Sequence, residues 1–242
     1  MREVTSDGWW AEAWARLQPG TGPVPGAPVV WVVLGVAVAA VVLPPVWWRV
    51  RVLVTVVHEL GHGTVGVLCG RRFTGLVLRP DMSGHAVTVG SSRGTGLVLT
   101  TWAGYPAPAV VGSALVHVAL AGWSAPVLGA ATVVLMGSLL RVRSVYTGAV
   151  MVVAAALTAA LWWAGTPAQQ GAVVLGLGVF LLLGAWRHLA AVVAPRADSR
   201  GSDPAVLARL THVPAALWNV SFAAVLAVAT WLAIGPVVQS LV

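Results

Sequence analysis

Residues 54–64 read Val-Thr-Val-Val-His58-Glu59-Leu-Gly-His62-Gly-Thr, inside an apolar stretch that runs from about residue 52 to 70. A helix turns by about 100° per residue, so His58 and His62 lie on one face and their imidazoles converge. Two histidines with a carboxylate form the open tetrahedral site of hydrolytic zinc enzymes. Glu59 lies beside them, where a carboxylate can act as general base towards a zinc-activated water. The stretch predicts a site for one zinc ion on an apolar helix.

The rest of the chain surrounds this stretch with further apolar segments. Of its 242 residues, 58% are hydrophobic and only 9% are charged, which is far from the composition of a soluble domain. The chain therefore predicts an all-α polytopic membrane protein of about six to eight transmembrane helices. Glu59 is the one acidic residue in these segments, and an ionisable group at membrane depth indicates function. The seven expected segments are 29–48, 52–70, 97–121, 124–140, 145–164, 171–193 and 214–238.

Three segments outside these stretches have patterns of their own. Residues 73–89 hold two β-rich runs around the turn-forming sequence Arg-Pro-Asp-Met-Ser-Gly, which predicts a β-hairpin next to the zinc helix. Residues 194–203 are expected to form a polar loop. Residues 1–28 predict an N-terminal interfacial helix followed by a linker rich in proline and glycine. We expect residues 29–242 to form a single transmembrane domain.

The fourteen basic residues are all arginine, and they stand singly or in pairs between the apolar stretches. This is the pattern of the positive-inside rule, so we expect a lipid bilayer and no nucleic acid as partner. If the N-terminus is cytoplasmic, ten loop arginines lie on the cytoplasmic side and only Arg49 and Arg51 lie outside. This asymmetry predicts a cytoplasmic N-terminus. The lack of lysine is typical of a high-GC bacterial genome, which favours a bacterial cytoplasmic membrane. The single cysteine, Cys69, excludes an intramolecular disulfide and a multi-cysteine metal cluster.

Two histidines do not complete a zinc site, so a third ligand must come from elsewhere. The remaining candidates are Asp81, His85, His117, Asp198 and Asp203. Asp203 begins the last helical region, from which it can project towards a neighbouring helix. However, an aspartate followed by proline is also typical of an ordinary helix start. The residues alone leave the choice open.

Several motifs together resemble the site-2 protease family of intramembrane zinc metalloproteases, in particular its compact bacterial and plant-like branch. The resemblance covers residues 50 to 220. Its carriers are His58-Glu59-Leu-Gly-His62, Cys69-Gly-Arg-Arg72, Pro80-Asp-Met-Ser-Gly84, Ala103-Gly-Tyr-Pro-Ala-Pro108 and Ser202-Asp203-Pro-Ala-Val-Leu-Ala. It implies that Glu59 is the general base and that Asp203 joins His58 and His62 as a metal ligand. The chain departs from better-known members in that no Asp-Gly pair follows its arginine-rich loop, which leaves Asp198 and Asp81 as alternatives to Asp203.

The resemblance implies an intramembrane zinc metalloendopeptidase that cuts membrane proteins in or near their transmembrane helices. Residues 73–89 could pair with an unwound substrate by β-addition, although no individual substrate-binding residue is predicted. The alternative is a catalytically inactive, membrane-embedded zinc-binding scaffold or regulator, which the missing Asp-Gly pair favours. A transporter or channel fits less well, because solute pathways place polar groups on several helices.

Overall fold

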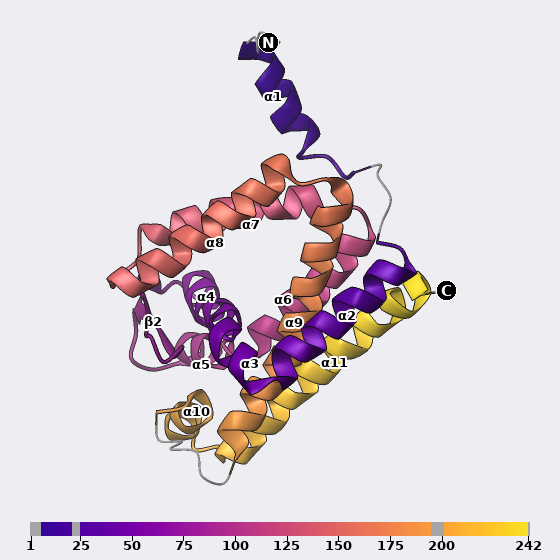
Figure 1. Ribbon diagram of the computed structural model, residues 1–242. Helices are drawn as coiled ribbons and strands as arrows, with labels where there is room; N and C mark the ends of the chain where they lie inside the picture. Colours follow the sequence, from indigo (N-terminus) through magenta and orange to yellow (C-terminus); the bar gives the residue numbers. More distant parts are fainter. Residues whose placement is uncertain (1–5, 21–24, 195–200, 242) are drawn as a thin grey trace.

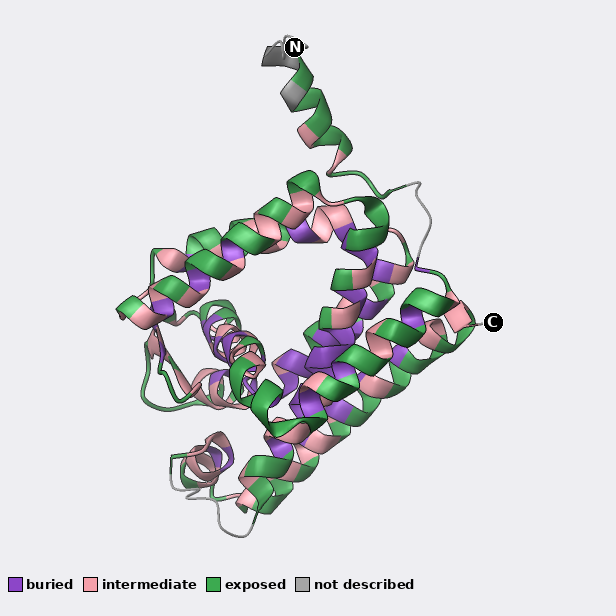
Figure 2. Ribbon diagram, viewed as in Figure 1, coloured by how far each residue is buried: buried purple, intermediate pink, exposed green. Residues whose placement is uncertain are grey.

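The core of the structure is built around one long helix, α9 (Pro167–Val193). Three further helices pack against it: α2 (Ala27–Val42), α6 (Pro106–Leu120) and α11 (Ala215–Leu241) (Figure 1). Fully buried side chains such as Leu175 and Phe222 fill the space between them, whereas the outward faces are exposed (Figure 2). The computed structural model describes residues 6–20, 25–194 and 201–241.

Glycines bring α6 and α9 into close contact. A Cβ atom on Gly112 of α6 would lie 2.7 Å from the carbonyl oxygen of Gly178, and one on Gly178 would lie 2.8 Å from that of Gly112. Small residues allow such an approach of two helix backbones, and they are typical of helix contacts inside membranes. The pair therefore fixes the distance between the two helices that carry Tyr105 and His188 beside the site described below.

The number of membrane spans is lower than the apolar stretches suggest. Within residues 6–20, 25–194 and 201–241, three helices are long and apolar enough to cross a membrane, namely α8 (Val145–Ala164), α9 and α11. Two bent pairs raise the number to five if each pair is one span. They are α2 with the region Pro44–Leu68, bent by 93°, and α5 (Thr95–Trp102) with α6, bent by 60°. The apolar helix α7 (Ser124–Leu139) is shorter. The predicted all-helical class is confirmed, and the predicted six to eight spans are an approximation.

The sharper bend has a cause in the sequence. Leu43 is extended, and Pro44 and Pro45 begin the short helix α3 (Pro44–Val50) directly after it. Proline cannot continue a preceding helix, and it disfavours helical backbone in the residue before it. α4 (Val52–Leu68), which carries the His-Glu-x-x-His motif, therefore runs across the direction of α2 and does not form a separate parallel span.

The predicted hairpin is present next to α4. β1 (Arg72–Leu78) pairs antiparallel with β2 (Gly84–Val89), with Leu76 opposite Ala86. In the turn, the Asp81 carboxylate accepts hydrogen bonds from the side chain and the backbone N–H of Ser83, at 2.7 and 3.0 Å. These hydrogen bonds hold the pKa of Asp81 below its usual value. They explain why this Pro-Asp-x-Ser-Gly sequence forms a tight turn.

Only one edge of the hairpin is open. On the outer edge of β1, the Leu76 N–H donates to the Arg141 carbonyl at 2.9 Å, and the Arg143 N–H donates to the Leu76 carbonyl at 3.2 Å. The chain between α7 and α8 thus covers this edge. The turn is held against α4, where the Thr55 hydroxyl donates to the Met82 carbonyl at 2.8 Å. The free edge of β2 faces the first turns of α4.

The N-terminal residues form a helix, α1 (Ser6–Ala15), that extends away from the other helices (Figure 1). Directly after it, the Arg16 guanidinium donates to the carbonyl of Trp162, in the last turn of α8, at 3.0 Å. The expected polar loop 194–203 lies partly outside the described residues, and its last residue begins α10 (Asp203–Thr211). An interfacial position for α1 and a single domain over residues 29–242 stay predictions.

Several arginines contact the hairpin or the helices next to it. Arg51 donates to the Asp81 carbonyl in the hairpin turn, Arg143 to the Thr74 carbonyl in β1, and Arg71 to the Thr88 hydroxyl in β2. Arg187 of α9 lies over the Trp47 ring. The predicted topology had Arg49 and Arg51 on the side opposite to the other loop arginines. Arg51 contacts the turn of the hairpin, which carries Arg72 and Arg79, and the predicted orientation of the N-terminus stays a prediction.

Candidate metal centre

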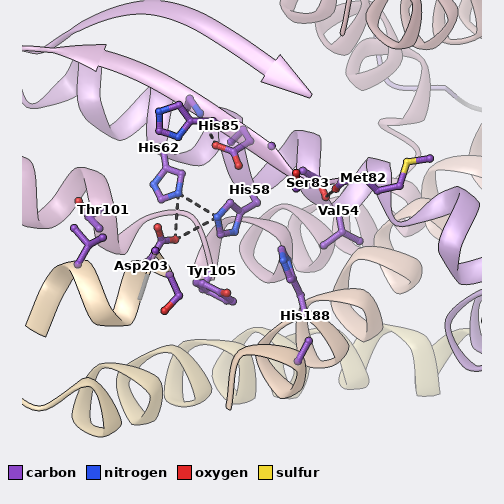
Figure 3. A pocket seen from close by; sticks show the side chains of 18 of the residues that line it. Val54, His58, His62, Met82, Ser83, His85, Thr101, Tyr105, His188 and Asp203 are labelled. Carbon is purple, nitrogen blue, oxygen red and sulfur yellow. Dashed lines mark hydrogen bonds and ion pairs between the residues drawn. The ribbon is translucent and has the colours of Figure 1, made fainter. Parts of the chain in front are cut away.

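Two ring nitrogens and one carboxylate oxygen form a small triangle (Figure 3). Asp203 Oδ2 lies 3.2 Å from His58 Nε2 and 3.2 Å from His62 Nε2, and the two nitrogens are 3.1 Å apart. The three side chains are between 8% and 18% exposed. Among the described residues, no other group of three histidine, cysteine or acidic side chains brings its ligand atoms within 4.8 Å of one another. Such a triangle needs a proton or a cation between its atoms.

The triangle has the size that a zinc ion requires. Three ligand atoms of a tetrahedral zinc site, each about 2.0–2.1 Å from the metal, are about 3.3–3.4 Å apart. The separations of 3.1 and 3.2 Å are shorter than this by a few tenths of an ångström. The donor set of two imidazoles and one carboxylate is also the set found in hydrolytic zinc sites. The residues therefore fit zinc with little movement.

The orientation of His62 is fixed by the neighbouring helix. Its Nδ1–H donates to the Thr100 carbonyl of α5 at 2.7 Å, which leaves Nε2 with a lone pair that points to the centre of the triangle. Metal-ligating histidines usually donate their second ring nitrogen in this way. The start of α6 also lies close to α4 because of Gly61, on which a Cβ atom would stand 2.5 Å from the Cβ of Ala107. The glycine of the His-Glu-Leu-Gly-His sequence is therefore a packing requirement.

Gly104 keeps the centre of the site open. A Cβ atom at this position would overlap His62 Nε2 and would lie 2.7 Å from His58 Cε1. The residue stands between α5 and α6, at the 60° bend. The sequence Ala103-Gly-Tyr-Pro-Ala-Pro108 thus brings a backbone without a side chain against the two ligand rings, and Pro106 then starts the next helix.

Asp203 reaches the site as the first residue of α10. Ser202 before it is extended and Pro204 follows it, which is a favourable order for a helix start. Pro204 and Leu207 are buried and anchor the short helix. Burial alone would raise the pKa of Asp203, but hydrogen bonds and charge interactions with His58 and His62 outweigh it, so the pKa lies below its usual value. The carboxylate is therefore ionised, as a metal ligand must be.

Glu59 lies between the histidine helix and the hairpin. Its Oε2 accepts a hydrogen bond of 2.7 Å from the backbone N–H of Ala86 in β2. Gly84 allows this approach, because a Cβ atom there would lie 2.7 Å from Glu59 Cγ and 2.8 Å from Glu59 Oε1. Glu59 itself is only 5% exposed. The glutamate is thus positioned by the strand through Oε2, and Oε1 takes no part in this hydrogen bond.

A cavity of about 840 Å³ opens onto these groups. α4, β2, α5, α9 and the start of α10 border it, and residues Gly84 to Thr88 of β2 form one wall. Arg51, Arg71 and Arg187 also line it. The cavity is large enough for a peptide segment of a few residues, and it places such a segment next to both Glu59 and the ligand triangle.

The other sequence candidates for the third ligand lie elsewhere. The carboxylate of Asp81 is bound to Ser83 within the hairpin turn. The ring of His117 donates to the Ser113 carbonyl of its own helix at 2.8 Å. His85 is exposed on β2 and does not belong to the triangle. Asp198 lies outside the described residues. Of the candidates within the described part of the chain, only Asp203 meets the two histidines.

His188 also lines this cavity, although it belongs to no recognisable motif of the sequence. Its ring centroid lies 5.2 Å from that of His58 and 5.3 Å from that of Tyr105. Tyr105 in turn contacts the His58 ring edge-on at 5.0 Å and stacks on Phe222. The signal in the sequence is weak: His188 is a polar residue within an apolar helix, next to Arg187, and such a pair near a helix end resembles an ordinary interfacial anchor.

Comparison with known proteins agrees with this geometry. A family model described as "Peptidase M50B-like" matches residues 31–233, which include every residue of the candidate centre. A search of curated proteins and a search of solved structures found no significant match. The M50 peptidases are zinc metalloproteases, and with its membrane-spanning helices the chain is an integral membrane protein. The chain therefore belongs to the Peptidase M50B-like family, that is, to the site-2 proteases.

Proposed function

We propose that the protein is an intramembrane zinc metalloendopeptidase that hydrolyses peptide bonds in or near the transmembrane segments of membrane proteins. One observation carries this proposal. The ligand triangle of His58, His62 and Asp203 and the carboxylate of Glu59 border the same cavity, next to an open strand edge. A bound zinc ion supplies Lewis acidity, which polarises a water molecule and the peptide carbonyl.

The residues of the chain divide the remaining work. His58, His62 and Asp203 hold the metal, and the Thr100 carbonyl fixes the orientation of the His62 ring. Glu59 accepts a proton at Oε1 from the attacking water and passes it to the leaving amine. The hydrogen bond from Ala86 holds the glutamate in place during both transfers. Apolar helices around the cavity limit the access of bulk water.

The free edge of β2 is a suitable place for the substrate. In the hairpin, Leu76 pairs opposite Ala86, and the Ala86 N–H points away from β1, towards Glu59. An extended segment added to this edge would lie along the cavity wall. A transmembrane helix shields its peptide bonds by internal hydrogen bonds, so local unwinding must precede cleavage. The edge offers partners for the backbone groups that unwinding exposes.

The decisive experiment compares Glu59→Gln with the wild-type chain. Both proteins are purified in detergent and reconstituted with a panel of single-span membrane helices. The variant should keep about one zinc per chain and lose cleavage, because Gln cannot accept the proton. Glu12→Gln is the matched control, since Glu12 forms an exposed ion pair with Arg16 on α1, and it should cleave as the wild type does. Cleavage by Glu59→Gln at the wild-type rate would refute the proposed role.

A catalytically inactive zinc-binding scaffold is the second candidate. It is favoured by the hydrogen bond between Glu59 and Ala86, which gives the glutamate a purely structural use. In this case the wild-type chain binds zinc but cleaves no member of the panel. Glu59→Gln would then weaken the contact between hairpin and helix without changing any turnover.

We also propose a membrane orientation that differs from the one that the sequence suggests. The arginine-rich end, with the hairpin, α10 and the metal centre, faces the cytoplasm, and the N-terminus lies on the other side. Arg51, Arg71 and Arg143 all bind the hairpin. Arg16 instead contacts Trp162, near the start of α9. Arg187 stands twenty residues further along α9 than Pro167, about 30 Å away. The positive-inside rule places the end with more arginines in the cytoplasm.

A further inference from the structure

The two histidine ligands differ in how their second ring nitrogen is held. His62 donates its Nδ1–H to the Thr100 carbonyl. His58 Nδ1 is buried and has no hydrogen-bond partner among the described residues. A buried polar atom without a partner costs free energy, and a ligand histidine usually has a defined outer partner. A hydrogen-bond partner for His58 Nδ1 is therefore expected on the side of the ring that faces away from the ligand triangle.

His188 of α9 lies at that position. In Figure 3, its side chain points towards His58 from the side away from His62 and Asp203. The two ring centroids are 5.2 Å apart, with 48° between the ring planes. No other polar ring of the described chain contacts His58 apart from His62 and Tyr105. A separation of this size suits either a direct hydrogen bond after a small rotation or a bond through one water.

The packing of α9 on α4 keeps this pair in register. One turn before His188, Gly184 approaches Val54, which lies one turn before His58. A Cβ atom on Gly184 would be 2.6 Å from Val54 Cγ2. Residues four apart lie on the same helix face, so the contact between Gly184 and Val54 brings His188 to His58 on the next turn. α9 thus presents an imidazole to the ligand where the sequence shows only an apolar helix.

We propose that His188 is the positioning residue of the ligand His58. Its imidazole accepts the Nδ1–H of His58, directly or through one water, and thereby directs His58 Nε2 towards His62 and Asp203. The inference rests on the metal centre under "Proposed function". Each ligand histidine then has one hydrogen-bond partner on its second ring nitrogen. α5 supplies a backbone carbonyl to His62, and α9 supplies a side chain to His58.

The test measures zinc affinity of the full-length chain in detergent by competition with a chelator. His188→Ala should weaken zinc binding by about 10- to 100-fold, the usual effect of removing an outer partner. His188→Gln should restore the affinity to within about threefold, because its amide oxygen can accept the same hydrogen bond. His117→Ala is the matched control, since His117 is also in an apolar helix but binds only its own backbone. It should leave the affinity unchanged.

Cobalt(II) in place of zinc separates positioning from a loss of folding. The visible absorption bands of the cobalt-loaded chain report the ligand geometry, so they should shift in His188→Ala and return in His188→Gln. Unchanged affinity and unchanged bands in His188→Ala would overturn the proposal. So would an equal effect of Tyr105→Phe without any effect of His188→Ala, because the tyrosine hydroxyl would then be the partner. If the wild-type chain and His58→Ala bind zinc equally, the metal centre itself is wrong, which is a separate outcome.

Discussion

Glu59 Oε2 accepts a 2.7 Å hydrogen bond from the backbone N–H of Ala86, so the strand that borders the cavity also holds the proposed base. The two residues are 27 positions apart in the chain. In the proposed function, substrate binding along β2 and proton transfer by Glu59 are therefore coupled, because a shift of the strand moves the carboxylate. The first prediction concerns the residue that permits this contact.

Gly84→Ala should impair cleavage without removing the metal. The added Cβ would lie 2.8 Å from Glu59 Oε1, so the carboxylate must move, and overpacking of this kind costs about 1–3 kcal/mol. If that cost falls on the orientation of the base, cleavage slows by about tenfold or more. Gly35→Ala is the control, because a Cβ atom there meets nothing within 4 Å. The prediction fails if both variants cleave at the wild-type rate.

Asp203→Asn should reduce zinc affinity by at least about 100-fold, because a neutral amide replaces the anionic ligand. Chelator competition with the purified chain measures this effect. Asp81→Asn is the control, since the Asp81 carboxylate binds Ser83 in the hairpin turn. Asp198→Asn tests the remaining sequence candidate. Loss of zinc in Asp198→Asn with full binding in Asp203→Asn would reassign the third ligand.

Gly104→Ala should prevent zinc binding in a chain that still folds. The methyl group would overlap His62 and lie 2.7 Å from His58 Cε1, so at least one imidazole must turn away from the triangle. Gly137→Ala, on α7, provides a control in open space. Circular dichroism should show equal helix content in both variants, and metal analysis should show zinc only in the control. One zinc per chain in Gly104→Ala would contradict the geometry of the site.

The proposed orientation predicts which ends of the chain a reagent outside the cell can reach. A cysteine placed after α1, Gln18→Cys, should react with a membrane-impermeant maleimide in intact cells, because Gln18 is exposed. A cysteine in the hairpin turn, Ser83→Cys, should react only after the membrane is opened. Cys69→Ala serves as the background, because it removes the native thiol. The reverse labelling pattern would restore the cytoplasmic N-terminus that the sequence suggests.

Local patterns of the sequence predict the parts of the site that are local in the chain. His58 and His62 converge because they are four residues apart on one helix, and this holds for any helix that contains them. The hairpin follows from the turn at Pro80–Gly84, since Asp81 binds Ser83 two residues later. The family resemblance points to Asp203 from a distance of 141 residues, which no local pattern can do. The structure places its oxygen 3.2 Å from both imidazoles.

Other features depend on contacts that no local pattern records. In the sequence, Pro44 indicates that a helix ends before it. The direction that α4 then takes depends on how α2 packs against α9. Arg51 looks like one loop arginine among others, and only the structure shows that it contacts the turn at Asp81. His188 looks like an interfacial residue until Gly184 brings its helix against α4. In each case, the deciding distance is between residues far apart in the chain.

The chain between α7 and α8 that covers β1 has a consequence for association. A two-stranded sheet with two open edges can pair with copies of itself and grow, which leads to aggregation. Here the contacts of Leu76 with Arg141 and Arg143 close one edge. The other edge opens only into the cavity beside the metal centre. The hairpin can therefore accept one further strand at most, and that strand would lie in the cavity beside the metal centre.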